Sequence, residues 1–202
     1  MLFARIITMV LALLGPGVLP VLAGSGRPVI VLDPGHGGRD RGTMWGGVSE
    51  KTLTLSIARK VESHLRARGF TTAMTRRSDV FRSLEGRASV ANGFRKSVFV
   101  SIHCNADPRR RARGIETYYC GAQGLKLARH IHAHLDNRTS TPNRGIKLAG
   151  FSVLRCTNGP AALVECGFLT SPTERRLLTT GIYQERIARA IADGITESVR
   201  RY

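Results

Sequence analysis

The chain has 202 residues, of which 42% are hydrophobic, and its formal net charge at pH 7 is +17. This length and apolar content suit one domain with a substantial core, so a second domain is not required. The charge predicts an anionic partner. Nucleic acid is not expected in that role, because aromatic residues make up only 6% of the chain and the basic residues are scattered.

Residues 1–23 have the pattern of a secretory signal peptide. Arg5 precedes an apolar run from Ile6 to Leu14, and Val21-Leu22-Ala23 suits a cleavage signal of small residues. A membrane anchor is the alternative, but prolines interrupt the segment and the run is shorter than the roughly 20 residues that a span needs. We therefore expect export to the periplasm or the extracellular envelope, a mature domain at 24–202, and anionic envelope polymers among its partners.

The mature chain alternates apolar runs with helical patterns, which predicts an α/β fold with a mostly parallel sheet covered on both faces. In chain order, strands are expected at Pro28–Leu32, Phe70–Thr75, Val98–His103, Ile115–Cys120 and Ala161–Phe168. Helices are expected at Ser49–Arg68, Leu84–Asn92 and Gln123–Leu135, after the capping box at Ser171–Glu174, and through Ile187–Val199.

Three connecting segments complete the chain. The arginine-rich run Arg109–Arg113 lies between two predicted strands and is expected to be a loop. Asp136–Gly150 contains proline and glycines and has no assigned element, and Phe151–Arg155 is a short apolar segment after it.

A glycine-rich loop follows the first predicted strand in the stretch VIVLDPGHGGRDRG, residues 29–42. A dinucleotide-binding turn is excluded by spacing, since the third glycine of that motif would fall at Asp40. What remains is a loop at the carboxyl end of a strand, where α/β sheets bind ligands. His36 is therefore a candidate metal ligand or base, and Asp33 either orients it or forms the turn.

Three further residues belong with His36. His103 ends another predicted strand, Glu50 opens the helix after the glycine-rich loop, and Glu165 is a carboxylate inside a run that otherwise indicates a buried strand. Glu50 alone could simply favour the helix N-terminus. Together, two imidazoles and a carboxylate make a three-ligand zinc set with a position open for water, and a second glutamate can act as base. This set predicts hydrolytic chemistry.

At these residues the sequence resembles the zinc-dependent N-acetylmuramoyl-L-alanine amidases, which cut the stem peptide from the glycan strand of bacterial peptidoglycan. The resemblance runs from about Pro28 to Val199. It is carried, in the family's order and spacing, by LDPGHGG, the glutamate at position 50, the R...AN pattern at Arg87–Asn92, SIHCNA, GIETYY and LVECGFLT. One position departs from the pattern, since Cys104 follows His103 where a small residue such as alanine is usual.

The resemblance implies a three-layer α/β/α sandwich around a mixed sheet. It also implies one zinc ion per chain on His36, Glu50 and His103, with Glu165 as the catalytic glutamate. Zinc would polarise the lactyl carbonyl of N-acetylmuramic acid and acidify its water, while Glu165 would pass that water's proton to the amine of L-alanine. Alternatives are a zinc peptidase on the same substrate and a non-catalytic module that binds the wall or nucleic acid.

Some members of the family carry a helical plug between the second histidine and the catalytic glutamate. The interval from His103 to Glu165 is filled by expected elements, so no obligatory activator protein is expected. Oligomeric state is not predicted.

The remaining polar candidates are weaker. Asn105 and the loop residue Arg144 could line the substrate groove, although turn chemistry explains such loops equally well. His130 and His134 lie one turn apart on a predicted helix and are expected to be solvated surface. Strand alternation turns Cys104 and Cys166 away from the site, so they should lie close together beneath it.

Overall fold

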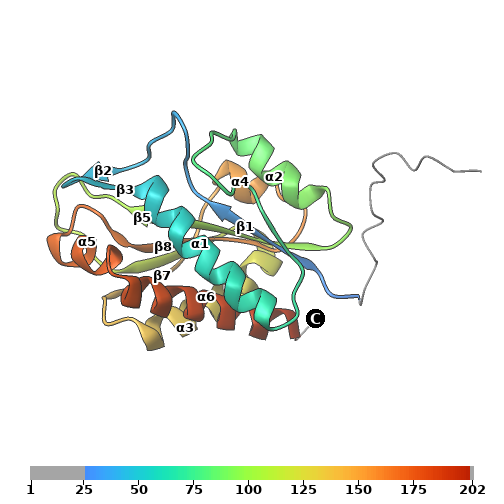
Figure 1. Ribbon diagram of the computed structural model, residues 1–202. Helices are drawn as coiled ribbons and strands as arrows, with labels where there is room; N and C mark the ends of the chain where they lie inside the picture. Colours follow the sequence, from blue (N-terminus) through green and yellow to red (C-terminus); the bar gives the residue numbers. More distant parts are fainter. Residues whose placement is uncertain (1–25, 201–202) are drawn as a thin grey trace, which may run out of the picture.

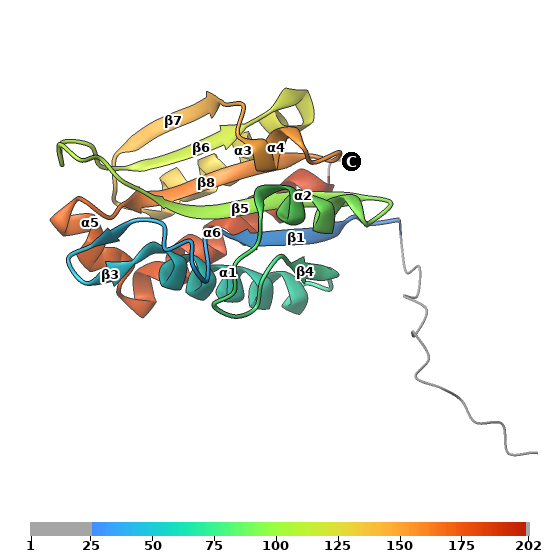
Figure 2. The same ribbon diagram turned by 90° about the horizontal axis from the view of Figure 1, so that it is seen from above.

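The structure, a computed structural model, describes residues 26–200, and the predicted signal peptide lies outside these residues. Its centre is a six-stranded sheet in the order β4-β1-β5-β8-β6-β7, which Figure 2 shows from above. Only the β6–β8 pairing is antiparallel among those in the sheet, so the expected mostly parallel, mixed sheet is confirmed. The strands are β1 (Val29–Pro34), β4 (Thr72–Met74), β5 (Ser97–Asn105), β6 (Ile115–Tyr119), β7 (Asn143–Leu148) and β8 (Ala161–Phe168).

One face of the sheet carries the larger core. Alternate strand residues such as Leu32, Val100 and Val164 point to this face and pack under three helices. Helix α6 contacts both of the others and so lies between them (Figure 1). The three helices are α1 (Glu50–Ala67), α3 (Gly121–Arg138) and α6 (Gly181–Arg200).

The opposite face is only partly covered. Val31, Phe99 and Leu163 point to it and pack against the helices α2 (Leu84–Asn92) and α4 (Ser152–Arg155). These two helices lie together on the far side of the sheet from α3 and α6 (Figure 1). The resulting three layers are those expected from the sequence, and the candidate site residues lie on this partly covered face.

The predicted element pattern is confirmed with small shifts of boundaries. Helix α2 and strand β8 have the predicted bounds. Ser171 caps helix α5 (Pro172–Leu178) by accepting a hydrogen bond from the Glu174 amide, as the capping box indicated. Ser49 is the residue before α1, but its side chain makes no capping hydrogen bond.

Strand β7 corrects the sequence analysis, because it lies in the stretch that was left without an element. The short hairpin of β2 (Met44–Trp45) and β3 (Val48–Ser49) was not predicted either. Among residues 26–200, no helix is long and apolar enough to cross a membrane.

Candidate metal centre and catalytic site

The two predicted histidines meet at the carboxyl ends of neighbouring strands. His36 lies two residues after the end of β1, and His103 lies near the end of β5, which pairs in parallel with β1. Their ring centroids are 4.9 Å apart in an edge-to-face arrangement. His36 has a φ of 60°, which a residue with a side chain adopts only when its surroundings impose it, as they often do at functional sites.

Glycines around the two rings provide the space for them. A Cβ added to Gly35 would lie 2.2 Å from Cε1 of His103. One added to Gly42 would lie 2.5 Å from Cδ2 of His36 and 2.7 Å from a carboxylate oxygen of Glu50. The glycine-rich loop is therefore required for close approach of the backbone to the imidazoles, and not for binding a nucleotide.

Glu50, the first residue of α1, lies between the two imidazoles. Its Oε1 is 3.1 Å from Nε2 of His36 and 3.0 Å from Nδ1 of His103. The backbone amides of Thr43 and Cys104 also donate to this carboxylate. Burial opposes its ionisation, but the hydrogen bonds from His103 and His36 outweigh burial and lower the pKa of Glu50. The side chain thus does more than favour the helix N-terminus.

The three side chains fit a zinc ion. His36, Glu50 and His103 each offer one ligand atom, and these atoms lie within 4.8 Å of one another. Two imidazole nitrogens and one carboxylate oxygen form a donor set that suits zinc and leaves a position open. Nδ1 of His36 is 2.8 Å from a carboxylate oxygen of Asp40, an arrangement that fixes the ring and directs Nε2 towards the site. The predicted ligand set is thus brought together.

Glu165 lies beside this set, as the sequence predicted. It is the register partner of His103 on β8, and it lines the same hollow as His36, Glu50 and His103. Its Oε2 is buried and has no hydrogen-bond partner among the described residues. Burial, followed by repulsion from Glu50 and Glu116, raises the pKa of Glu165 well above its ordinary value. A carboxyl group placed beside the three candidate ligands and free of other partners in the described part of the chain can act as a general base.

Asp33 does not orient the His36 ring, and it does more than form the turn after β1. It is fully buried and accepts hydrogen bonds from Thr75, Arg87 and Ser101, with no contact to the His36 ring. Arg87 also donates to the backbone carbonyls of Pro34 and His36. The Asp33–Arg87 pair therefore holds the backbone of the loop, while Asp40 orients the imidazole.

Of the two predicted substrate-binding residues, Asn105 and Arg144, only Asn105 lines the hollow beside Glu165. Asn105 lines the hollow of the zinc set. The prediction of a loop around Arg144 is wrong, since this residue belongs to β7 and does not line that hollow. Both side chains donate to Glu116, a buried residue of β6 that the sequence analysis did not single out. The signal was present, because Glu116, like Glu165, is a carboxylate within an apolar strand pattern.

The family model for N-acetylmuramoyl-L-alanine amidase matches residues 30–197. The chain belongs to the N-acetylmuramoyl-L-alanine amidase family. The match covers all four residues of the predicted site, and it confirms the resemblance inferred from the motifs.

Relatives and solved structures in the family agree with this assignment. The germination-specific N-acetylmuramoyl-L-alanine amidase of Bacillus subtilis is 34% identical over 89% of this chain and 81% of its own length. The amidase LytC of the same organism is 35% identical over 85% of this chain, which spans only 35% of LytC. The amidase AmiC2 of Nostoc punctiforme has a TM-score of 0.84 at 38% identity, with 88% of this chain and 100% of that structure covered.

Among the described cysteines of this family member, none is bonded. Cys104 and Cys166 are fully buried in the core on the face opposite His36, Glu50 and His103. Burial is the main cause of the raised pKa of both thiols. The predicted orientation away from the site is confirmed.

His130 and His134 were expected to be solvated surface, which is only partly correct. Both are half-buried and pair with Glu197 of α6, at 3.5 and 3.0 Å respectively. They join α3 to α6 and lie outside the group that could hold a metal.

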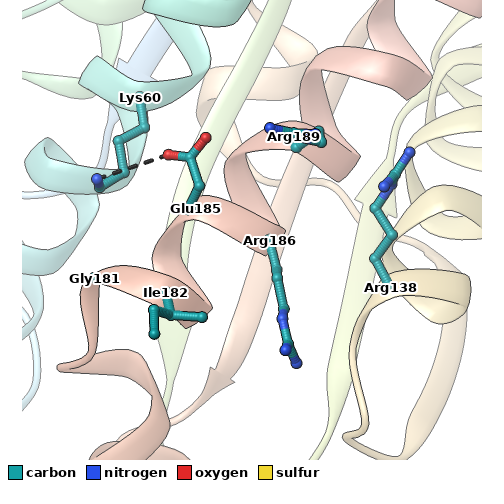
Figure 3. A pocket seen from close by; sticks show the side chains of 7 residues that line it. All are labelled: Lys60, Arg138, Gly181, Ile182, Glu185, Arg186 and Arg189. Carbon is teal, nitrogen blue, oxygen red and sulfur yellow. Dashed lines mark ion pairs between the residues drawn. The ribbon is translucent and has the colours of Figure 1, made fainter.

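A second hollow lies on the outer surface of α1, α3 and α6 (Figure 3). Lys60, Arg138, Arg186 and Arg189 surround it, and Glu185 pairs with Lys60 at 3.8 Å. Its lining has no histidine or cysteine, and it shares no residue with the zinc set. This hollow is therefore part of the basic surface.

Proposed function

We propose that the chain hydrolyses the amide bond between the lactyl group of N-acetylmuramic acid and L-alanine of the stem peptide in bacterial peptidoglycan. The observation that carries this proposal is Glu165, a buried carboxylate without a hydrogen-bond partner beside a His-Glu-His group of the zinc type. Membership of the amidase family supplies the bond that is cut. The chain spans only part of some relatives, so the substrate is proposed for this domain alone.

The side chains divide the work between them. His36, Glu50 and His103 would hold the ion, and Asp40 orients His36 for it. Zinc bound there supplies a Lewis acid towards a carbonyl oxygen and lowers the pKa of a water molecule towards about 7. Oε2 of Glu165 is free to accept the proton of the attacking water and to deliver it to the nitrogen of the leaving L-alanine. A covalent enzyme intermediate is not required.

The proposal is tested by digestion of purified peptidoglycan with the zinc-loaded protein, with and without a chelator, followed by mass spectrometry of the products. Stem peptides with a free L-alanine amino group are expected only without the chelator. Release of smaller peptides or of single D-amino acids would instead show a peptidase. Unchanged peptidoglycan would show that the domain is not a hydrolase of this polymer.

Export and surface binding belong to the same proposal. The predicted signal peptide and the peptidoglycan substrate both require a position in the cell envelope. The basic hollow formed by Lys60, Arg138, Arg186 and Arg189 suits an anionic envelope polymer. Replacing both Arg186 and Arg189 by glutamine should weaken retention on isolated cell walls while cleavage of a small soluble muropeptide remains unchanged.

We further propose that the mature domain acts without a partner protein. The interval between His103 and Glu165 is occupied by β6, α3, β7 and α4, and the hollow with the zinc set is open to solvent along exposed Phe151 and half-buried Asn105. Purified residues 24–202 with zinc should release stem peptides from isolated peptidoglycan. Activity that appears only after addition of an envelope protein would contradict this.

A further inference from the structure

A carboxylate cluster lies next to the zinc set on the same face of the sheet. Glu116 on β6 is the register partner of Glu165 on β8, and paired residues of neighbouring strands point to the same face. Helices α2 and α4 pack over β1, β5 and β8, so the part of this face formed by β6 and β7 extends beyond them. Glu116 therefore lies between the catalytic carboxyl group and an uncovered part of the sheet.

Four donors converge on the carboxylate of Glu116. The Lys147 ammonium lies 2.6 Å from it, the Tyr118 hydroxyl 2.6 Å, the Asn105 amide nitrogen 2.9 Å, and Nε of Arg144 also donates. Burial opposes its ionisation, but the hydrogen bonds from Lys147, Tyr118 and Arg144 outweigh burial and lower the pKa of Glu116. The residue is thus ionised, and it fixes two cationic side chains of β7 in place.

The positive charge of Arg144 and Lys147 exceeds the negative charge of Glu116. Glu116 with Arg144 and Lys147 carries a net charge of about +1, and the two basic side chains remain 37% and 38% exposed. Arg144 uses only Nε towards Glu116, so within residues 26–200 both of its terminal nitrogens have no hydrogen-bond partner. The outer edge of the guanidinium group is therefore available for a second, bidentate contact.

The cluster adjoins the hollow of the zinc set through two contacts. Asn105 lines that hollow and donates to Glu116. Phe151 also lines it, and its ring packs edge-to-face on Tyr118 with the centroids 5.1 Å apart. An extended substrate whose amide bond lies beside Glu165 would therefore reach Arg144 and Lys147 within a few residues.

We propose that Arg144 and Lys147, positioned by Glu116, form a subsite that binds a carboxylate of the stem peptide. Replacing a free carboxyl group on the residue after L-alanine by a carboxamide would remove the charge that such a subsite binds. A net positive subsite on β7, two strands from Glu165 on β8, distinguishes the two forms, because only the acid can accept a charged, bidentate contact. This inference rests on the proposed function.

The experiment compares two soluble muramyl tripeptides that differ only in that carboxylate or carboxamide. The wild-type protein is expected to cleave the acid with a kcat/KM about tenfold higher than the amide, the usual scale for a hydrogen bond to a charged group. Arg144→Gln and Lys147→Gln should each remove most of this preference by slowing cleavage of the acid alone. Arg129→Gln, a matched change at an exposed position of α3 on the other side of the sheet, should leave both rates unchanged.

A binding measurement separates this inference from the proposed function. Calorimetric titration of zinc-loaded Glu165→Gln protein with the same tripeptides should show the acid binding about tenfold more tightly, and Lys147→Gln in that background should remove the difference. If neither tripeptide is cleaved but the binding preference persists, the proposed reaction fails and the subsite stands. Equal binding of the two tripeptides would overturn the subsite, and so would an equal loss of affinity for both tripeptides in the variants. In either case Arg144 and Lys147 would serve only to neutralise Glu116.

Discussion

His103 and Glu165 face each other as register partners on the parallel strands β5 and β8. Because side chains alternate along a strand, both point to the face with the open hollow, and Cys104 and Cys166 after them point into the opposite core. One pairing between two strands thus places the carboxyl group of Glu165 beside the candidate ligand His103. It also separates the reactive groups from the buried thiols.

Replacing Glu165 by glutamine should abolish catalysis without loss of the metal. The amide keeps the shape of the side chain but cannot accept a proton, so we expect kcat to fall at least about a hundredfold. Zinc content, measured by mass spectrometry of the metal, should match the wild type. Glu185→Gln on α6 is the control and should retain full activity, because its carboxylate pairs with Lys60 and His64 far from the zinc set. Wild-type rates in Glu165→Gln would end the assigned role.

Replacing His36 by alanine should remove the zinc. The change deletes one of three ligands and leaves Asp40 and Glu50 without the imidazole that they contact. The loss of zinc should be nearly complete after dialysis against buffer that retains the metal in the wild type. His130→Ala is the matched control, since His130 pairs with Glu197 and lies outside the ligand group. Full occupancy in His36→Ala would exclude His36 from the set.

The four cysteines should differ sharply in their reaction with iodoacetamide. Cys156 is exposed, whereas Cys104 and Cys166 are fully buried and burial raises the pKa of both thiols. In the folded protein, peptide mapping should show alkylation of Cys156 within minutes and none of the buried pair. Unfolding in denaturant without a reductant should then expose both as free thiols. A disulfide between either of them and another cysteine would contradict the structure.

Stability should fall in acid partly through Glu62. Hydrogen bonds from Arg77 and then from Thr72 outweigh burial and lower the pKa of Glu62 in the folded state. A lowered pKa means that the contribution is present above the unfolded pKa of about 4.3 and is lost as the pH falls below it. Glu62→Gln should therefore reduce the free energy of unfolding by about 1 kcal/mol at pH 7. In chemical denaturation the difference should shrink towards pH 3, and a difference that is constant with pH would refute the ion pair.

Elements with a strong periodic pattern could be predicted from the sequence, and weakly patterned elements could not. Helix α1 repeats Leu53, Ile57, Val61 and Leu65 on its buried side, and all four lie in the core. Strand β7 was missed because it is an edge strand with few apolar residues, and Gly145 interrupts its pairing with β6 at a register shift. Tertiary pairing, rather than local preference, makes this segment a strand.

Three of the candidate site residues could be identified from the sequence because each one interrupts a clear local pattern. His36 follows an apolar strand, and His103 and Glu165 lie within apolar strands. Glu116 has the same signal, because it is a carboxylate within the apolar pattern of β6, but its role depends on Arg144 and Lys147, which are distant in the chain. Asp40 was equally hidden among the charged residues of the glycine-rich loop. A contact between two segments that are distant in the chain cannot be predicted from the spacing of residues within either segment.

The antiparallel direction of β6 has a consequence for how such a domain can diversify. Since β6 runs opposite to β8, β6 and β7 begin at the edge where β1 and β5 end. The arginine-rich connection before β6, which Asp107 ties together through the amides of Arg109, Arg111 and Ala112, therefore opens at the catalytic edge. Lengthening or exchanging this connection would reshape the walls around a bound glycan or peptide while every strand kept its register. Homologues can thus acquire new substrate preferences by insertion at one loop, with the hydrolytic centre left intact.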